Sequence, residues 1–596
     1  MKVAFFLFAT AVAAVANAGG DFLTAVHSRS MRSLEGKWSY IVDPQETGFL
    51  DYRHNETTGG YFIDIPVNGY KRLIEHDFDR SAKMQIPGAW NCQDLRTFYY
   101  EGVMWFRTKF NYQKCKGRRT RLYFGAVNYE SYVYLNGKKL GRHVGGFTPF
   151  DYDVTDVLVD GENSLVVKAD NRRQISAVPT DIFDWWNWGG ITREVLLVDL
   201  PDLHMRDVYL QAAKGNLKRL RGEISLSTAV AGEKTTIEIP ELGIKAESVT
   251  DKTGTARFDI GAEPQPWSPE NPKLYKVVFS HGDERVTDEI GFRTIEVVGD
   301  EIRLNGKKIF LRGACLHDEA EGAKGRVATR AEAETLIARA KKMNCNFLRL
   351  AHYPHHEYTV RAAEKAGIMV WGEIPAYWTI SWDNPETLAN AKAQLNALIR
   401  RDRSRANVII WSVANETPHS DARDRFLTEL VATARRADNT RLVSFAMETV
   451  LLEDGTRSLK DNLASLVDVA SFNCYMGWYG FRELDAIPKI KWAIPWKKPV
   501  IVSEFGGGAL AGLHGDEYDY FSEERQAAIY RANLKMYGKI KELSGLAPWI
   551  LSDFRSPRRN RAQVQDGFNR KGLTDENGRE KLAFQVMKSF YAEKAK

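Results

Sequence analysis

The sequence predicts a multidomain protein in which two β-sandwiches precede a (β/α)8 TIM barrel. Short strands of alternating polarity fill residues 19–200, and a second all-β stretch fills residues 201–298. From residue 299 to residue 596, continuous apolar runs alternate with amphipathic helices. The first pattern is typical of antiparallel sheets, and the second of parallel strands covered on both faces. A chain of 596 residues has room for several domains, each with its own core.

The first 18 residues have the pattern of a secretory signal peptide. Met1-Lys2 precedes an apolar run from Val3 to Val15, and the small residues Ala16-Asn17-Ala18 provide a cleavage site. We therefore expect export, with the choice between a periplasm and the medium left open. The run is too short to span a bilayer and no later run approaches the length needed, so we expect no membrane association.

The first sandwich is predicted from short strands bounded by turn residues. Tyr132–Leu135 and Ser164–Lys168 fit half-buried strands, and Asn136-Gly137 and Asp160-Gly161 are turn signals. The second sandwich runs from Val208–Leu210 to Lys276–Phe279, and its length suits an immunoglobulin-like domain.

The barrel is predicted from eight apolar runs with helices between them. Arg330–Met343 and Leu388–Arg401 show the 3.6-residue apolar period of such helices. Eight strand-helix units in roughly 300 residues are what a (β/α)8 barrel requires. The candidate strands are Ile309–Leu316, Asn346–Leu350, Ile368–Trp371, Val408–Val413, Leu442–Phe445, Val469–Phe472, Val500–Val502 and Pro548–Leu551.

Two glutamates stand where barrel strands end. Glu416 follows the run Val408–Val413, and Glu504 follows Val500–Val502. Because the reactive groups of such barrels come from the C-terminal ends of the strands, this position favours a catalytic role over a structural ion pair. Cleavage of a glycosidic bond uses one carboxylic acid and one carboxylate, so the pair suggests sugar chemistry.

Composition excludes several other classes of protein. The net charge of +6 is small for this length and the basic residues are scattered, so we expect no nucleic-acid partner. The 44% hydrophobic and 27% charged residues are ordinary for a globular protein. Five cysteines without CxxC spacing argue against a disulfide framework or a zinc site, although one incidental bridge is left open. They are Cys92, Cys115, Cys315, Cys345 and Cys474.

Six motifs together resemble glycoside hydrolase family 2, the retaining exo-glycosidases that include β-glucuronidases and β-galactosidases. The resemblance covers nearly the whole mature chain. It implies a jelly-roll sugar-binding domain, an immunoglobulin-like domain and a TIM barrel, and it implies no cofactor. The motifs are Gly125–Asn128, Val133–Gly137, Asp184–Ile191, Asn346–Pro354, Asn415-Glu416 and Ser503–Gly506.

The resemblance also implies a role for each site residue. Glu416 would be the acid/base and Glu504 the nucleophile, so Glu504 is expected to stay charged while Glu416 holds a proton. Arg349 would hold Glu504 ionised and oriented, Asn415 would reach the sugar 2-hydroxyl, and Tyr475 would lie beside the nucleophile. The predicted substrate-binding set is Asp184, Arg349, His352, Asn415, Asn473, Tyr475, Tyr479, Trp549, Asn569 and Lys571.

Structural alternatives stand beside some of these roles. Arg349 also fits an ordinary barrel ion pair, Asp184 a loop-surface aspartate, and Trp549 a packing residue. The cluster His352, His355 and His356 suggests a metal site only superficially, because such a site needs converging ligands with an open position. We expect no metal there.

The sugar is predicted from Asn569 and Lys571. Their Asn-x-Lys spacing resembles the pair by which β-glucuronidases hold the sugar carboxylate, and an ammonium beside an anionic ring is favourable. Gln565 departs from the arginine that such enzymes often carry there, and the segment from Arg555 to Arg561 also resembles some β-galactosidases.

We therefore predict a β-glucuronidase, with β-galactosidase as the alternative. A noncatalytic carbohydrate-binding protein on the same scaffold is a further alternative, against which the retention of both glutamates argues. A homo-oligomer is left open.

Overall fold

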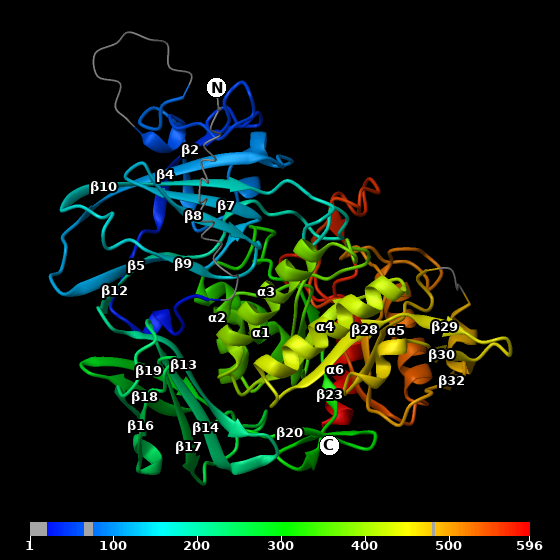
Figure 1. Ribbon diagram of the computed structural model, residues 1–596. Coiled ribbons are helices and arrows are strands. Elements are labelled where there is room, and N and C mark those ends of the chain that lie inside the picture. Colours follow the sequence, from blue (N-terminus) through cyan, green and yellow to red (C-terminus); the bar gives the residue numbers. More distant parts are fainter. Residues whose placement is uncertain (1–20, 65–75, 480–482, 596) are drawn as a thin grey trace, which may run out of the picture.

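The computed structural model describes residues 21–64, 76–479 and 483–595 (Figure 1). The predicted signal peptide, residues 1–18, lies outside them. Figure 1 shows two β-domains, blue to cyan and green, beside a larger domain of strands and helices that runs from green to red. No helix in the described ranges is long and apolar enough to cross a membrane.

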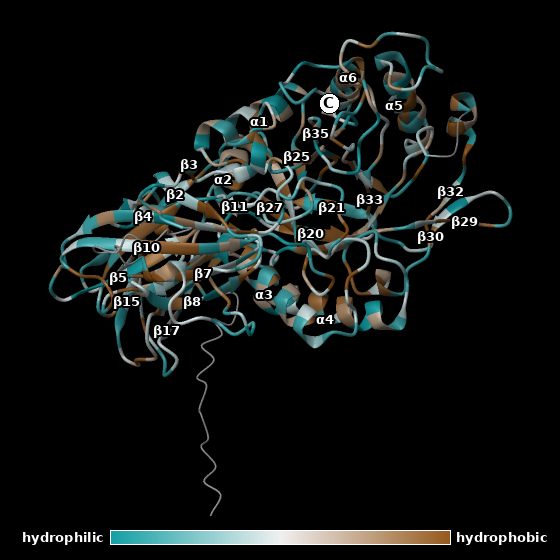
Figure 2. Cartoon of the chain, turned by 90° about the horizontal axis from the view of Figure 1, so that it is seen from above, coloured by the Kyte–Doolittle hydropathy of each residue, from teal (hydrophilic) through white to brown (hydrophobic). Residues whose placement is uncertain are grey.

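The first domain is a sandwich of a six-stranded sheet (β3-β2-β4-β10-β7-β8) and a four-stranded sheet (β1-β12-β5-β9). Asn136 and Gly137 join β7 to β8 with φ of 52° and 77°, the backbone of a tight hairpin turn. The apolar residues of the two inner faces form one core, and Figure 2 shows hydrophobic stretches along these strands. The main strands are β1 (Met31–Ser33), β2 (Gly36–Val42), β3 (Lys83–Ile86), β4 (Val103–Tyr112), β5 (Arg118–Phe124), β7 (Glu130–Leu135), β8 (Lys138–Val144), β9 (Phe150–Asp153), β10 (Gly161–Asp170) and β12 (Val195–Pro201).

The second domain is a smaller sandwich of three strands (β13-β14-β17) and four strands (β16-β15-β18-β19). Its Trp267 is fully buried, and the indole N–H donates to the carbonyl of Glu364 in the barrel at 3.1 Å, which fixes this domain to the barrel. The strands are β13 (Met205–Ala213), β14 (Asn216–Leu226), β15 (Lys234–Ile239), β16 (Ile244–Val249), β17 (Thr255–Gly261), β18 (Tyr275–His281) and β19 (Glu284–Ile290).

The third domain is a closed parallel barrel. Its sheet runs β23-β34-β33-β31-β28-β27-β26-β25-β24, and because β23 and β24 are two halves of the first strand, the sheet returns to its own beginning. The strands are β23 (Leu311–Arg312), β24 (Cys315–Leu316), β25 (Phe347–Leu350), β26 (Met369–Glu373), β27 (Val408–Asn415), β28 (Leu442–Met447), β31 (Ala470–Asn473), β33 (Val500–Glu504) and β34 (Leu543–Leu546). The helices are α1 (Arg330–Lys342), α2 (Glu357–Lys365), α3 (Pro385–Asp402), α4 (Asp421–Ala437), α5 (Glu523–Tyr537) and α6 (Leu582–Lys594).

The predicted fold class is confirmed, and one strand was misplaced. The eighth barrel strand is β34, not the predicted run Pro548–Leu551. Ser544 and Gly545 interrupt the apolar pattern of β34. Hydrophobicity along the sequence therefore did not mark this segment as a strand. Gly545 is needed there, since a Cβ would lie 2.6 Å from the Cβ of Leu311 on the neighbouring strand.

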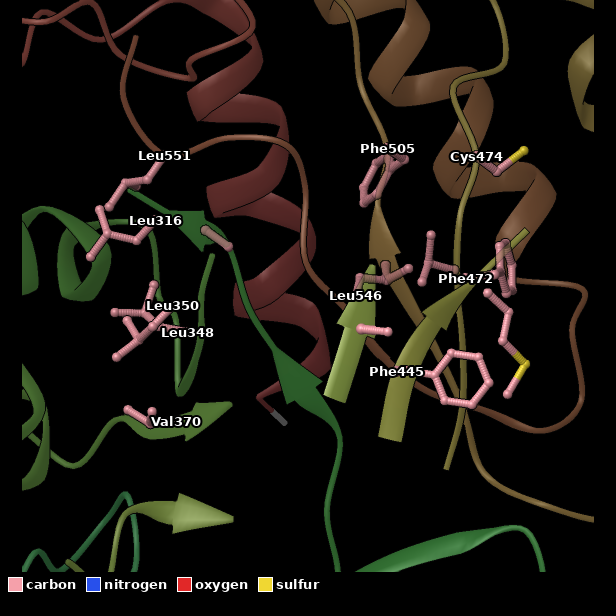
Figure 3. Close-up of a cluster of buried hydrophobic side chains, with 14 of the residues drawn as sticks. Leu316, Leu348, Leu350, Val370, Phe445, Phe472, Cys474, Phe505, Leu546 and Leu551 are labelled. Atoms are coloured by element: carbon pink, nitrogen blue, oxygen red, sulfur yellow. The ribbon is translucent and has the colours of Figure 1, made fainter. Parts of the chain in front are cut away.

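Successive side chains of the barrel strands point alternately outward to the helices and inward to the centre of the barrel. Leu348 and Leu350 point outward into the core between strands and helices, where Figure 3 shows them near Val370. Arg349, between these two leucines, and Trp371 point inward. The inward face therefore carries the polar groups that reach the mouth of the barrel. All five cysteines are unpaired, so the incidental bridge left open by the sequence is not formed.

Candidate active site

The two predicted glutamates lie at the C-terminal ends of barrel strands. Glu504 is the last residue of β33, and Glu416 directly follows β27. A register shift occurs near each: between Ser412 and Asn415 on β27, and before the pairing of Asn473 with Glu504. Such irregularities re-aim side chains beside active sites. Glu416 also has a φ of 48°, a backbone conformation that residues with a side chain adopt rarely.

Glu504 is buried and held at both carboxylate oxygens. Arg349 Nη1 donates to Oε1 at 2.7 Å, and the Tyr475 hydroxyl donates to Oε2 at 2.5 Å. His352 Nε2 lies 3.8 Å from Oε1. Burial raises the pKa of Glu504; Arg349 opposes this shift and the charge of Glu416 adds to it. The charge of Glu416 is therefore close enough to act on Glu504.

Glu373 fixes the arginine that contacts Glu504. It closes β26, and its two oxygens accept from Arg349 Nε and Nη2, each at 3.1 Å. The indole N–H of Trp371 donates to Oε2 at 2.8 Å, and His352 Nδ1 lies 2.8 Å from Oε1. Burial opposes ionisation of this carboxyl, but Arg349 and His352 outweigh it and lower the pKa of Glu373 to about 2. The guanidinium is thereby locked in one orientation.

Asn415 stands between the arginine and the sixth strand. Its Oδ1 accepts from Arg349 Nη2 at 2.7 Å and from Asn473 Nδ2 at 3.1 Å. Asn473 is itself positioned by the hydroxyl of Ser503, which donates to its Oδ1 at 2.8 Å. The buried Nδ2 of Asn415 has no hydrogen-bond partner in the part of the chain that the structure describes. This amide can therefore donate to a ligand hydroxyl.

Trp378 positions the carboxylate of Glu416. Its indole N–H donates to Glu416 Oε2 at 3.0 Å, and its ring packs against Tyr377 with centroids 4.4 Å apart. Glu416 is only partly buried. This carboxyl therefore faces the open side of the mouth, whereas Glu504 lies deeper.

Trp549 and His352 form one wall of the site. Their rings stack with centroids 4.8 Å apart and an interplanar angle of 23°. The other two histidines of the cluster point elsewhere: His355 Nε2 meets a backbone carbonyl at 2.8 Å, and His356 Nε2 lies 3.1 Å from Glu194. These histidines do not converge, and no group of His, Cys, Asp and Glu suited to a metal occurs among the described residues.

Asp184 reaches the barrel mouth from the first domain. Its Oδ1 accepts from the Ser556 hydroxyl at 2.6 Å, and its Oδ2 accepts from Arg559 Nη2 and from Asn569 Nδ2, the latter at 3.4 Å. It is buried rather than exposed on a loop. The jelly-roll domain thus contributes directly to the site.

Lys571 is a buried cation with aromatic neighbours. Its Nζ donates to the Tyr479 hydroxyl at 2.8 Å and lies 5.0 to 5.7 Å from the ring centroids of Tyr475, Trp478 and Tyr479. Its backbone N–H donates to Asn569 Oδ1 at 3.2 Å. No carboxylate of the described residues forms an ion pair with it. The adjoining cavity of about 310 Å³ is lined by Trp478, Tyr479, Gly508, Tyr520, Phe521, Arg559, Arg561, Gln565, Asn569, Arg570 and Lys571.

The structure brings the predicted residues into one connected network at the barrel mouth and adds others that the sequence analysis missed. Glu373 could have been found, since it closes an apolar run just as Glu416 and Glu504 do. Trp378 and Ser556 lie in loops without periodicity, so no sequence pattern marked them. The arrangement offers two interacting carboxylates, a fixed cation and hydroxyl-binding amides, which suits cleavage of a glycosidic bond.

Comparisons with known proteins agree with this geometry. The chain is 24% identical over 616 residues to a β-glucuronidase of Paenibacillus borealis, covering 95% of this chain and 97% of that protein. It is 28% identical to a β-galactosidase of Thermoanaerobacter pseudethanolicus, covering 77% of this chain but only 61% of the relative. The structure of Bifidobacterium dentium β-glucuronidase complexed with coumarin-3-O-glucuronide superposes with a TM-score of 0.81 at 22% identity, covering 95% of this chain and 97% of that one. This likeness shows a shared fold.

Three consecutive family models match the chain. The sugar binding domain of glycosyl hydrolases family 2 matches residues 31–201, the family's central domain matches 203–293, and its TIM barrel domain matches 295–593. With a catalytic-domain match over half its length and both flanking domains in order, the chain belongs to glycosyl hydrolases family 2 and is a glycoside hydrolase.

Proposed function

We propose that the protein is a retaining exo-β-glycosidase acting on β-glucuronides, with Glu504 as nucleophile and Glu416 as acid/base. In the first step Glu504 attacks the anomeric carbon while Glu416 donates its proton to the departing oxygen. In the second step Glu416 takes a proton from water, the water oxygen bonds to the anomeric carbon, and the bond to Glu504 breaks. The product keeps its configuration.

The contacts of the two glutamates support these roles. Arg349 and Tyr475 hold both oxygens of Glu504, which orients the nucleophile and favours its charged form against burial. Esterification of Glu504 removes a negative charge beside Glu416. This change favours the anionic form of Glu416 that activates water.

The observation that carries the sugar assignment is Lys571. Its side chain is buried, it has no acidic partner among the described residues, and only a tyrosine hydroxyl accepts from its ammonium. A buried ammonium is unfavourable without an anion, so a substrate carboxylate beside Lys571 and Asn569 would complete the site. A galactoside supplies no such charge. The β-glucuronidase relatives also support this assignment.

The test compares nitrophenyl β-glucuronide with nitrophenyl β-galactoside in the wild type and in Lys571→Ala. We expect kcat/KM for the glucuronide to fall by about a hundredfold or more, because truncating one partner of a buried charge pair costs roughly 2–5 kcal/mol. The rate on the galactoside should change little. Lys460→Ala, at an exposed lysine, is the matched control. A large galactoside preference that Lys571→Ala leaves unchanged would defeat the uronide assignment and favour a β-galactosidase.

Glu504→Gln tests the chemistry itself. The variant should fold and lose turnover, and a wild-type enzyme trapped with a 2-fluoro glycoside should carry the sugar on Glu504. Near-normal rates in Glu504→Gln would overturn the mechanism. Binding of glycosides without release of sugar from any β-linked substrate in the wild type would favour a noncatalytic binding protein.

We also propose that the protein is exported, on the strength of the signal-peptide pattern in residues 1–18. N-terminal sequencing of the protein from its own cells tests this. A mature chain that begins at Met1 would contradict it.

A further inference from the structure

Arg558 lies beside the acid/base at the open side of the barrel mouth. Its guanidinium carbon is 5.1 Å from the ring centroid of Trp378, whose indole N–H donates to Glu416 Oε2 at 3.0 Å. Tyr377 packs against the same indole. The indole thus connects the arginine to the carboxylate, so the cation, the ring and Glu416 form one group, which we call the outer arginine site.

The backbone conformation of Trp378 fixes the position of its indole. Trp378 has a φ of 55°, a left-handed conformation that is rare for a bulky residue, and its N–H donates to the carbonyl of Asn415 at 2.9 Å. Such conformations persist where the surroundings fix them, and they gather at functional positions. The position of the indole is therefore set by the strand end that carries Glu416.

The charge of Arg558 is uncompensated, unlike the charge of the next residue, Arg559. In the same loop Arg559 pairs with Asp184. Arg558 is exposed, and within the described ranges no carboxylate pairs with it and no acceptor takes a hydrogen bond from its guanidinium. A guanidinium that lies over an aromatic ring and forms no ion pair keeps its forked donors free for a carboxylate or a sulfate.

The proposed function fixes which part of the substrate meets this group. The acid/base protonates the oxygen of the leaving group, so a side chain that lies beyond Glu416 faces the leaving group and not the sugar that is attacked. Under that proposal, the carboxylate of the attacked sugar is held by Lys571. Arg558 is thus a second cation, and it would bind a second negative charge on the leaving group.

We propose that the outer arginine site binds an anionic substituent, a carboxylate or a sulfate ester, on the sugar that leaves. This inference rests on the proposed function and extends it. It makes the natural substrate the end of an acidic oligosaccharide, in which the unit after the terminal uronic acid is also charged.

The experiment uses three disaccharides with β-glucuronosyl at the nonreducing end. The second sugar is galactose, galactose 6-sulfate or galacturonic acid, so the two anionic arms distinguish a sulfate from a carboxylate. In the wild type we expect kcat/KM to be about tenfold higher for at least one anionic disaccharide than for the neutral one. Arg558→Gln should remove this preference, and Arg558→Lys should keep part of it. The preference should also shrink with added salt.

Controls separate this inference from the proposed function. Nitrophenyl β-glucuronide, with an uncharged leaving group, should react within about twofold of wild type in Arg558→Gln. Arg80→Gln, at an exposed arginine of the first domain, should leave all ratios unchanged.

The same second sugars carried on β-galactosyl disaccharides extend the test should galactosides be the accepted substrates. Equal rates on neutral and anionic disaccharides in the wild type, or a preference that survives in Arg558→Gln, would overturn the outer arginine site while leaving the glycosidase assignment intact. Failure to cleave any glucuronide, with cleavage of the galactosides, would overturn the uronide assignment alone.

Discussion

Glu373→Gln tests whether the carboxylate that holds Arg349 supports both folding and catalysis. The substitution removes a buried negative charge that accepts two hydrogen bonds from Arg349 and leaves the guanidinium with Glu504 as its only acidic partner among the described residues. The shift of the pKa of Glu373 from its ordinary 4.5 to about 2 corresponds to roughly 3 kcal/mol, since each pKa unit is worth about 1.4 kcal/mol. Breaking a buried ion pair by removing one partner costs about 3–5 kcal/mol, which agrees. We therefore expect a loss of about 3 kcal/mol in the free energy of unfolding at pH 7.

The sign of the pH dependence follows from the direction of the shift. A carboxyl whose pKa is lowered by folding stabilises the protein above its unfolded pKa, and this contribution is lost as the pH falls toward its folded pKa. The difference between wild type and Glu373→Gln should therefore be full at pH 7 and begin to shrink below pH 4.5. At pH 3.5 it should be about 1.4 kcal/mol smaller. Urea denaturation at both pH values measures it.

Activity should fall as well, because Arg349 orients both Glu504 and Asn415. Misplacement of reacting groups by about 1 Å can cost a hundredfold in rate, so we expect kcat to fall by about that factor. Glu364→Gln is the control, since Glu364 is a buried barrel carboxylate paired with Arg405 away from the site. The kcat of this variant should stay near normal. A stability loss below about 1 kcal/mol in Glu373→Gln, together with an unchanged kcat, would refute the reasoning.

Three further substitutions test other contacts. Tyr475→Phe removes the hydroxyl that donates to Glu504 at 2.5 Å, and kcat should fall about ten- to hundredfold, because hydrogen bonds to charged groups are worth about 1.5–3 kcal/mol; an unchanged kcat would contradict it. Lys581→Met removes the ammonium 2.7 Å from the buried Asp553, whose pKa is raised by burial to about 6 even with its cations present. Urea denaturation should show that the free energy of unfolding falls by about 3–5 kcal/mol. A fall below about 1 kcal/mol would count against the pairing. Burial raises the pKa of Glu319 to about 7, so the folded protein binds this proton more tightly than the unfolded chain and loses stability as the pH rises from 4.5 to 7. Melting temperatures of Glu319→Gln should fall less over that range than those of the wild type, and parallel curves would disprove the assignment.

Much of the fold could be predicted because its signals are local. Each barrel strand except the eighth contains an apolar run that the sequence shows, and helices such as α3 begin with a recognisable cap, Asn384 followed by Pro385. The eighth strand was missed because Ser544 and Gly545 serve packing against Leu311, a contact between residues far apart in the chain. Hydrophobicity alone does not report such a contact.

The candidate site was predictable only where a strand end or a family motif marked it. Glu416 and Glu504 satisfy both conditions, whereas Glu373 satisfies the first and was overlooked. The partners of Asp184 could not be inferred, because Ser556 and Arg559 are 372 and 375 residues away in the sequence. Only the closed ring of strands and the docking of the first domain bring them together.

The position of Asp184 means that part of the rim of the active site comes from the first domain and not from the catalytic barrel. An isolated barrel would lose the anchor that the loop at Ser556 and Arg559 holds, and that loop also carries Arg558. Exchange of the N-terminal domain between relatives would therefore transfer part of the substrate preference with it. Selection on the substrate then acts on two domains at once, which links the evolution of the domain without catalytic carboxylates to the chemistry of the barrel.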